Sequence, residues 1–340
     1  MSHADKTILV SGATGKQGGA LLKYLLGDGW RIRALTRNPR GRTAQELSKS
    51  GVEVVQGDME DLESLKRAMK GVHGVYSVQD FWTVGARREV LQGKNMADAA
   101  RSAGVEHLLY SSVGGAERNS GITHWETKWE VENYIRKLGL PVTVLRPAAF
   151  MENYYIAAVE IGILKGKLAD PIRGDKAFQT IAVDNIGAFG ALAFDRPNDF
   201  IGLELEIAGS ELTNVQAAEV FSRVLGKRVK FQKMPWPIVR FVLGKELYQM
   251  FRWFNQSGFQ ADIPALKLHF PEVRLLSLEE WLREEGWQKR ARILNHREID
   301  HLVLAGTHAA STRRARRFPS QPPPRNSKRL NSTDEKQYAC

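Results

Sequence analysis

Three glycines stand three residues apart near the amino terminus, at Gly12, Gly15 and Gly18. They follow an apolar run and precede a stretch of helical length. Glycine permits a tight turn and lets the backbone approach a phosphate, and the amino end of the next helix offers free N–H groups. A strand–turn–helix with this spacing is typical of a site for the pyrophosphate of a dinucleotide. The alternative is a glycine-rich turn without a ligand.

A basic residue occupies the position that usually decides which dinucleotide is bound. Arg37 follows the second apolar run, with Arg40 and Arg42 nearby. An NAD site usually has an acidic residue there, which binds the ribose 2′-hydroxyl. A guanidinium is instead suited to a 2′-phosphate, so Arg37 predicts NADP(H) rather than NAD(H). The alternative is a solvated surface arginine.

Polar residues also end the next three apolar runs. Asp58 could accept a hydrogen bond from an adenine amino group, or it could cap the following helix. Gln79, Ser111 and Ser112 should border the nicotinamide half of the ligand, because ligands lie beyond the carboxyl ends of parallel strands. Ser111 or Ser112 could orient a substrate carbonyl, or could simply end a strand.

A fourth signal lies after the fifth apolar run. Thr123 and Glu126 have the spacing of a capping box, which predicts a helix that begins at His124. His124 and Lys128 then share one helical face. Lys128 could bind the nicotinamide ribose or be a surface lysine. His124 could donate a proton or touch substrate, or be a polar residue of the first turn.

The elements that position these residues alternate strictly. Short apolar runs and helical stretches follow one another over residues 1–150, and glycines mark the helix ends. This order predicts a doubly wound α/β domain, a Rossmann fold with a parallel sheet covered on both faces. The expected strands are Thr7–Val10, Arg31–Thr36, Val52–Gln56, Gly74–Val78, His107–Ser112 and Val142–Arg146. The expected helices are Gln17–Leu26, Thr43–Lys49, Leu62–Met69, Arg87–Ala103 and Trp125–Leu138.

After residue 150, apolar runs and helical stretches no longer alternate regularly. Residues 151–290 are interpreted as a smaller α+β lobe, with some elements returning to the first sheet. Within it we expect a strand at Leu203–Ala208 and helices at Thr213–Leu225, Pro237–Phe254 and Ser277–Glu284. Residues 291–340 contain a proline run and many basic residues, and are predicted to be a mostly disordered tail.

Composition narrows the class of protein. The net charge is +11, of which the last 50 residues contribute +6, so the folded part does not have a nucleic-acid-binding composition. No apolar run is long enough for a membrane span, and the polar start excludes a secretory signal peptide. The one cysteine, Cys340, allows no intrachain disulfide. A cytoplasmic protein without a metal site is expected.

Taken together, these motifs resemble the NmrA-like family, an atypical branch of the short-chain dehydrogenase/reductases. The matching segments are Gly12–Gly19, Thr36–Pro39, Gly51–Asp58, the His124 and Lys128 pair, Leu145–Tyr154, Val183–Gly187 and Glu211–Lys227. The resemblance implies NADP(H) binding through Gly12, Thr14, Gly15, Gln17, Gly18, Arg37, Asp58 and Lys128.

What the resemblance implies for catalysis is twofold. Ordinary members of the superfamily carry Tyr-x-x-x-Lys, and His124 stands at the tyrosine position. Relatives with this change include redox sensors, so the first hypothesis is an NADP(H)-binding regulator of a partner protein. The alternative is an NADPH-dependent oxidoreductase acting on a quinone or carbonyl substrate, with His124 and Lys128 as candidate catalytic residues. Nucleic-acid binding by the basic tail is a third hypothesis, which the composition does not favour.

Overall fold

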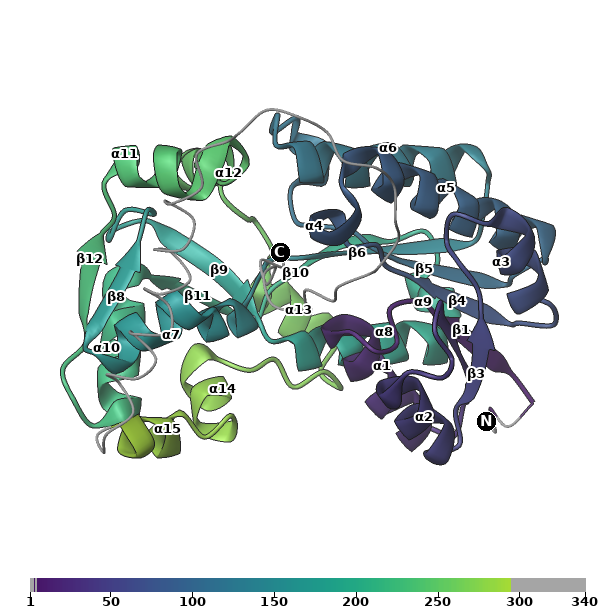
Figure 1. Cartoon of the computed structure of the whole chain (residues 1–340), viewed down its shortest axis with the longest axis horizontal. Helices are drawn as coiled ribbons and strands as arrows, with labels where there is room; N and C mark the ends of the chain where they lie inside the picture. Colours follow the sequence, from purple (N-terminus) through teal and green to yellow (C-terminus); the bar gives the residue numbers. More distant parts are fainter. Residues whose placement is uncertain (1–2, 4, 295–340) are drawn as a thin grey trace, which may run out of the picture.

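The computed structural model describes residue 3 and residues 5–294, with side chains through residue 290. The helix α15 (Trp287–Leu294) ends this part. Residues 295–340, and with them most of the predicted tail, lie outside the described residues. The described chain forms a large sheet domain and a smaller lobe, which lie side by side in Figure 1.

The sheet domain is built on seven parallel strands of the described chain. Their order is β10 (Glu204–Ile207), β6 (Val142–Pro147), β5 (His107–Ser111), β4 (Gly74–Ser77), β1 (Thr7–Val10), β2 (Arg31–Thr36) and β3 (Glu53–Gln56). The strand order reverses between β1 and β4, which makes the carboxyl edge at this point the expected ligand crevice of the fold. The predicted parallel, doubly wound sheet is confirmed.

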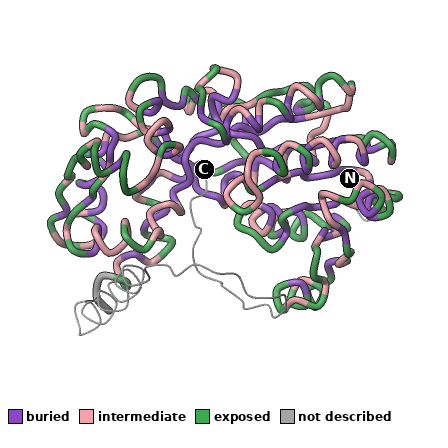
Figure 2. Tube along the Cα trace, turned by 45° about the horizontal axis from the view of Figure 1, so that its top comes forward, coloured by how far each residue is buried: buried purple, intermediate pink, exposed green. Residues whose placement is uncertain are grey.

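Helices cover both faces of the sheet (Figure 1). On one face lie α1 (Lys16–Gly27), α2 (Arg42–Lys49) and α8 (Val183–Asp195). On the other lie α3 (Leu62–Ala68), α5 (Ala86–Ser102) and α6 (Thr123–Lys137), with the short α4 (Phe81–Val84) at the edge. Side chains of β1 alternate between two apolar cores: Ile8 and Val10 join the first, and Leu9 the second. Burial on both faces explains why the strands appear as continuous apolar runs, and Figure 2 shows buried positions along the centre of the domain.

Two elements from later in the chain complete this domain. Helix α8 packs against α1, where a Cβ at Gly187 would lie 2.5 Å from the carbonyl carbon of Ala20. Only glycine permits so close a crossing. Strand β10 pairs with β6, with Glu204 opposite Val144. The short helix α9 (Pro197–Phe200) connects α8 to this edge strand.

The smaller lobe has two small sheets. One contains β7 (Ala149–Phe150), β9 (Ala177–Ile181) and β11 (Ser210–Thr213), and the other β8 (Lys167–Asp170) and β12 (Lys230–Lys233). The helical segments around them are η2 (Met151–Tyr155), α7 (Ala157–Leu164), α10 (Asn214–Leu225), α11 (Trp236–Ile238), η3 (Val239–Leu243), α12 (Gly244–Gln256), α13 (Ile263–His269) and α14 (Leu278–Glu284). Phe221, Trp281 and Trp287 are fully buried in the core of this lobe. Thr213 and Ser277, where two of the predicted helices start, both form capping boxes.

The stretch 237–254 is helical, as predicted, but it is not one regular helix. The structure divides this stretch into α11, a π-helical turn η3 and α12. Gly244 has φ +87°, a left-handed value that separates the last two segments. The apolar spacing of the stretch is continuous, so it does not reveal this break.

Candidate functional site

The glycine loop is closed tightly against the first turn of α1. Gly12 has φ +61°, and the N–H of Gly15 donates to its carbonyl oxygen at 2.8 Å. A Cβ at Gly18 would lie 2.3 Å from the same oxygen and 2.6 Å from the carbonyl carbon. Only glycine fits position 18 while the loop keeps this conformation.

No side chain caps the free backbone N–H groups at the amino end of α1. The N-cap is Gly15, no side chain caps the helix, and no acidic residue lies in its first turn. Gly12, Thr14 and Gly15 are exposed. Free N–H groups at the positive end of a helix dipole form a cradle for an anion. The residues present therefore fit the pyrophosphate of a dinucleotide.

Gln17 joins this loop to the sheet. Its Oε1 accepts a hydrogen bond from the Ser111 hydroxyl at 2.7 Å and lies 3.2 Å from the Tyr76 hydroxyl, which also donates. Ser111 and Tyr76 belong to β5 and β4. The loop is thus held at the point where the strand order reverses, and Ser111 faces the loop.

Arg37 lies exposed after β2 and has no ion-pair partner among the described residues. Arg42, by contrast, pairs with Glu46 of its own helix at 2.9 Å. Arg37 is therefore available to a ligand at the sheet edge. Its charge also makes a minor contribution to lowering the pKa of Glu60, after the hydrogen bonds from Arg88 and Gln92.

Asp58 does not cap the next helix, so that alternative is wrong. Helix α3 begins at Leu62, and its cap is Asp61, whose carboxylate accepts from two backbone N–H groups. Asp58 lies too far upstream. Its Oδ1 instead accepts the N–H of Glu60 at 3.0 Å and holds the preceding turn.

Lys128 is paired with a carboxylate that the sequence did not single out. Its side chain belongs to α6, and Nζ lies 2.9 Å from Oε1 of Glu89 on α5. Lys128 is 8% exposed and Glu89 is 0% exposed. The Thr127 hydroxyl donates to the second carboxylate oxygen of Glu89. Glu89 lies in an ordinary first helical turn, and no sequence signal marked it.

His124 is held by a residue of the smaller lobe. Its Nδ1 lies 2.6 Å from Oε1 of Glu246 on α12, and its backbone N–H donates to the same oxygen at 3.0 Å. The rings of Trp82 and Trp125 lie within 5.1 Å of the buried imidazole. Burial opposes the charge of Glu246, but hydrogen bonds from His124 and Thr123 lower its pKa overall.

The predicted capping box at the start of α6 is wrong. The helix begins at Thr123 with Ile122 as its cap, one residue earlier than expected. The Thr123 hydroxyl donates to Glu246 at 2.8 Å, and Glu126 accepts the N–H of Gly121 at 2.9 Å. A carboxylate from a distant helix thus replaces the local partner, which spacing alone could not predict.

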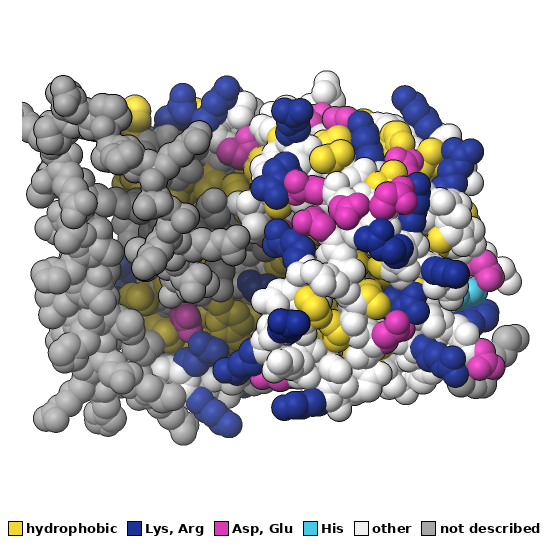
Figure 3. Space-filling view, turned by 45° about the vertical axis from the view of Figure 1, so that its right-hand side comes forward, with side chains coloured by type: hydrophobic (Ala, Val, Ile, Leu, Met, Phe, Trp, Pro, Cys, Tyr) yellow, Lys and Arg dark blue, Asp and Glu magenta, His cyan; other side chains and the backbone are white. Residues whose placement is uncertain are grey.

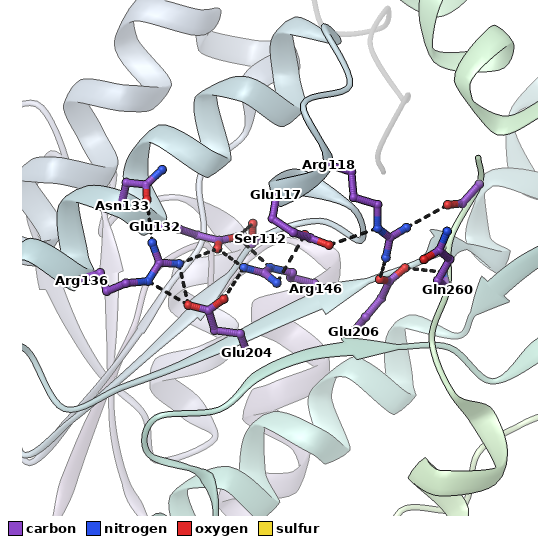
Figure 4. A network of polar contacts seen from close by, with 11 residues as sticks. Ser112, Glu117, Arg118, Glu132, Asn133, Arg136, Arg146, Glu204, Glu206 and Gln260 are labelled. Atoms are coloured by element: carbon purple, nitrogen blue, oxygen red, sulfur yellow. Dashed lines mark hydrogen bonds and ion pairs between the residues drawn. The ribbon is translucent and has the colours of Figure 1, made fainter. Parts of the chain in front are cut away.

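Ser112 belongs to a network of buried ions rather than to the loop (Figure 4). Its hydroxyl donates to Glu132, which also binds Arg146 at 2.5 Å. Arg146 reaches Glu204 of β10 at 2.6 Å. Burial opposes the charge of Arg146, but its carboxylate partners raise its pKa. Figure 4 shows that the network bridges α6, β6 and β10. These contacts hold the edge of the sheet in place, and the Ser112 hydroxyl is already hydrogen-bonded to Glu132.

An apolar pocket extends from the sheet edge into the smaller lobe. Trp82 follows β4 and Ala149 follows β6, and both line it. Its other aromatic side chains are Phe150, Tyr154, Phe178, Phe251 and Phe254, and its polar ones Asn153, Asp170, Thr180 and Asn214.

The comparison with known sequences settles the family. The model of the NmrA-like family matches residues 4–282. The chain belongs to the NmrA-like family. One relative is the NmrA-like family domain-containing oxidoreductase ptmS of Penicillium ochrochloron. The two sequences are 31% identical over 258 residues, and the match covers 68% of this chain and 77% of the relative.

Solved structures of other proteins share the fold. The NADPH-dependent quinone oxidoreductase QOR2 from Escherichia coli, complexed with NADPH, is 25% identical with a TM-score of 0.71 and covers 82% of this chain and 99% of its own. NmrA, a negative transcriptional regulator in complex with NADP, is 22% identical with a TM-score of 0.68, covering 83% and 95%. The second likeness shows the fold alone. This NmrA-like chain thus has an NAD(P)-binding fold.

Three further observations concern the described part of this NmrA-like chain. None of its helices has both the length and the apolar character needed to cross a membrane. No group of three or more His, Cys, Asp or Glu side chains is placed to hold a metal ion. On the face drawn in Figure 3, basic and acidic side chains are interspersed.

Proposed function

We propose that this chain binds NADP(H) and reduces an apolar ring compound, such as a quinone or an aromatic carbonyl, in the pocket between the two parts. The pocket carries this proposal. It starts at Trp82 and Ala149, beside the carboxyl edge of the sheet, and continues between apolar walls. Ligand sites in this fold lie at that edge, and a large apolar pocket with few polar groups suits a small organic substrate.

The proposed cofactor site uses the residues at the strand ends. Gly12, Thr14, Gly15, Gln17 and Gly18 would surround the pyrophosphate at the amino end of α1. Arg37 would pair with the 2′-phosphate, which favours NADP(H) over NAD(H). Bound NADPH supplies a hydride. Asp58 would accept a hydrogen bond from the adenine, and Lys128 would bind the nicotinamide ribose.

Glu89 and Glu246 support the two candidate catalytic residues. Glu89 fixes the ammonium of Lys128, and Glu246 fixes the imidazole of His124. Trp82, which lines the pocket, has its ring centroid 4.9 Å from that of His124. His124 is thus next to the pocket wall. Reduction of a quinone or carbonyl also consumes a proton, which His124 or water would supply.

A second function, regulation of a partner protein, is favoured by one contact. The pair of His124 and Glu246 joins α6 of the sheet domain to α12 of the smaller lobe. Movement of α6 on cofactor binding would therefore reach α12, and a partner there could respond to the NADPH/NADP ratio. The single cysteine is compatible with a reducing compartment such as the cytoplasm.

The test begins with purified protein, NADPH and a panel of quinones and aldehydes. Turnover supports the reductase, and tight NADPH binding without turnover supports the regulator. Ala158→Trp places a large side chain in the pocket, since Ala158 lines it. Its matched control is Ala157→Trp, at an exposed neighbouring position of α7 outside the lining. Turnover lost in Ala158→Trp alone, with NADPH affinity unchanged, places reduction in the pocket. Equal turnover in both variants refutes that location.

A further inference from the structure

One acidic side chain interrupts the apolar walls of the pocket. Asp170 ends β8 and lines the cavity together with Tyr154 and Phe254. Its Oδ1 accepts the N–H of Ile172 at 2.6 Å, which holds the carboxylate in place. Asp170 has no ion-pair partner among the described residues. A carboxylate in an apolar pocket is costly to desolvate unless a cation accompanies it.

The basic residue opposite Asp170 in the two-stranded sheet does not supply that cation. Lys233 is the register partner of Asp170 in β12, yet its charge acts on Asp175, whose pKa it helps to lower. Burial raises the pKa of Asp170 to about 6, against hydrogen bonds from Ile172 and Asn214, and no cation contributes. Its carboxylate is therefore mostly ionised at neutral pH. Burial, and then the charge of Asp170, raise the pKa of Tyr154, so this charge acts inside the pocket.

A second observation favours a ligand with positive character. The Oδ1 atom of Asn153 is buried, and no hydrogen-bond partner satisfies it among the described residues. Asn153 also lines the pocket. Asp170 and Asn153 thus belong to a cavity that six aromatic side chains also line. Aromatic rings attract cations, most strongly where water is excluded.

We propose that Asp170 selects planar apolar ligands that carry a positive charge, which the carboxylate, Asn153 and the aromatic walls bind together. This inference rests on the proposed function, because it names the substrate class of the same pocket. Binding itself requires no cofactor. Neutral rings of the same shape fit the apolar walls but leave the Asp170 carboxylate without a counter-charge.

The test compares two probes of nearly equal shape, N-methylacridinium and uncharged acridine, at pH 8. Their binding to the full chain without NADPH is measured by fluorescence titration. In the parent protein the cation should bind at least about tenfold more tightly than acridine. Asp170→Asn should remove most of this preference and leave acridine affinity unchanged. The asparagine keeps an oxygen acceptor for Ile172, so the turn is retained.

Asp175→Asn is the matched control, since Asp175 is an exposed acid that pairs with Arg173 at 3.0 Å and does not line the pocket. It should not alter either affinity. Ala158→Trp should weaken both probes, which locates them. Equal affinity of the parent for the two probes overturns the inference, even if Asp170→Asn does not fold. Selective cation binding without any NADPH-dependent reduction leaves the inference standing and removes only the proposed reductase.

Discussion

Replacement of Gly18 by alanine separates the geometry of the glycine loop from the general stability of α1. The new Cβ would lie 2.3 Å from the carbonyl oxygen of Gly12, 2.6 Å from its carbon and 2.9 Å from the N of Ala13. All three are backbone atoms, so the loop must open by at least about 0.7 Å before the closest contact reaches 3.0 Å. Overpacking of this kind costs about 1–3 kcal/mol of folding free energy.

Gly19 provides the control one residue later. A Cβ there meets only the carbonyl oxygen of Ala13, at an ordinary 3.7 Å. Gly19→Ala should therefore raise helix stability by about 0.5–1 kcal/mol and leave the loop unchanged. Gly18→Ala should lower the melting temperature by about 2–10 °C, and NADPH affinity by tenfold or more, because the N–H groups at the helix end are displaced. Thermal unfolding and NADPH fluorescence titration measure both. NADPH affinity in Gly18→Ala equal to that in Gly19→Ala would refute the proposed pyrophosphate site.

Three other perturbations follow from the site. Arg37→Ala should weaken NADP binding by about 10–100-fold and leave NAD binding nearly unchanged, measured by titration with both; equal losses would show that Arg37 does not contact the 2′-phosphate. Glu89→Ala leaves the buried ammonium of Lys128 without its partner and should lower the free energy of unfolding, measured with denaturant, by about 3–5 kcal/mol. The control is Glu130→Ala, which removes the partly exposed pair with Lys94 and should lower it by less than about 1 kcal/mol. Because hydrogen bonds lower the pKa of Glu246, its carboxylate stabilises the fold above its ordinary pKa, and this contribution is lost as pH falls through the lowered value; melting temperature against pH should be flatter in Glu246→Gln on the acid side.

The sheet domain was predictable because its signals are local. Each strand is an apolar run that is largely buried, a glycine follows each of the five predicted helices before the next strand, and the glycine loop lies between β1 and α1 as its spacing required. Most observed element bounds in this domain lie within one residue of the expected ones. The helices that start near Thr213 and Ser277 were also predicted, because the two partners of each capping box lie within four residues of each other.

The partners of the candidate catalytic residues could not be found in this way. Glu89 is 39 positions from Lys128, and Glu246 is 122 positions from His124. Helical spacing places a residue on a face but does not say which distant helix packs there. Thr123 is an example: the spacing predicted a capping box with Glu126, but the Thr123 hydroxyl instead donates to Glu246 of a distant helix. Asp170 was missed for the same reason, because only the folded pocket leaves it without a cation.

The sheet domain is completed by α8 and β10, which come late in the sequence, and this order affects how the chain folds during synthesis. When the ribosome has released residues 1–150, the sheet still ends in β6 with an open edge, and α1 lacks the helix that covers it. An unpaired parallel edge is prone to association with other chains. Closure waits until about residue 207 has emerged, after the first elements of the smaller lobe, from β7 to β9, have been made. Folding of the two parts is therefore interleaved, and truncation before β10 should yield aggregation-prone chains rather than an autonomous nucleotide-binding domain.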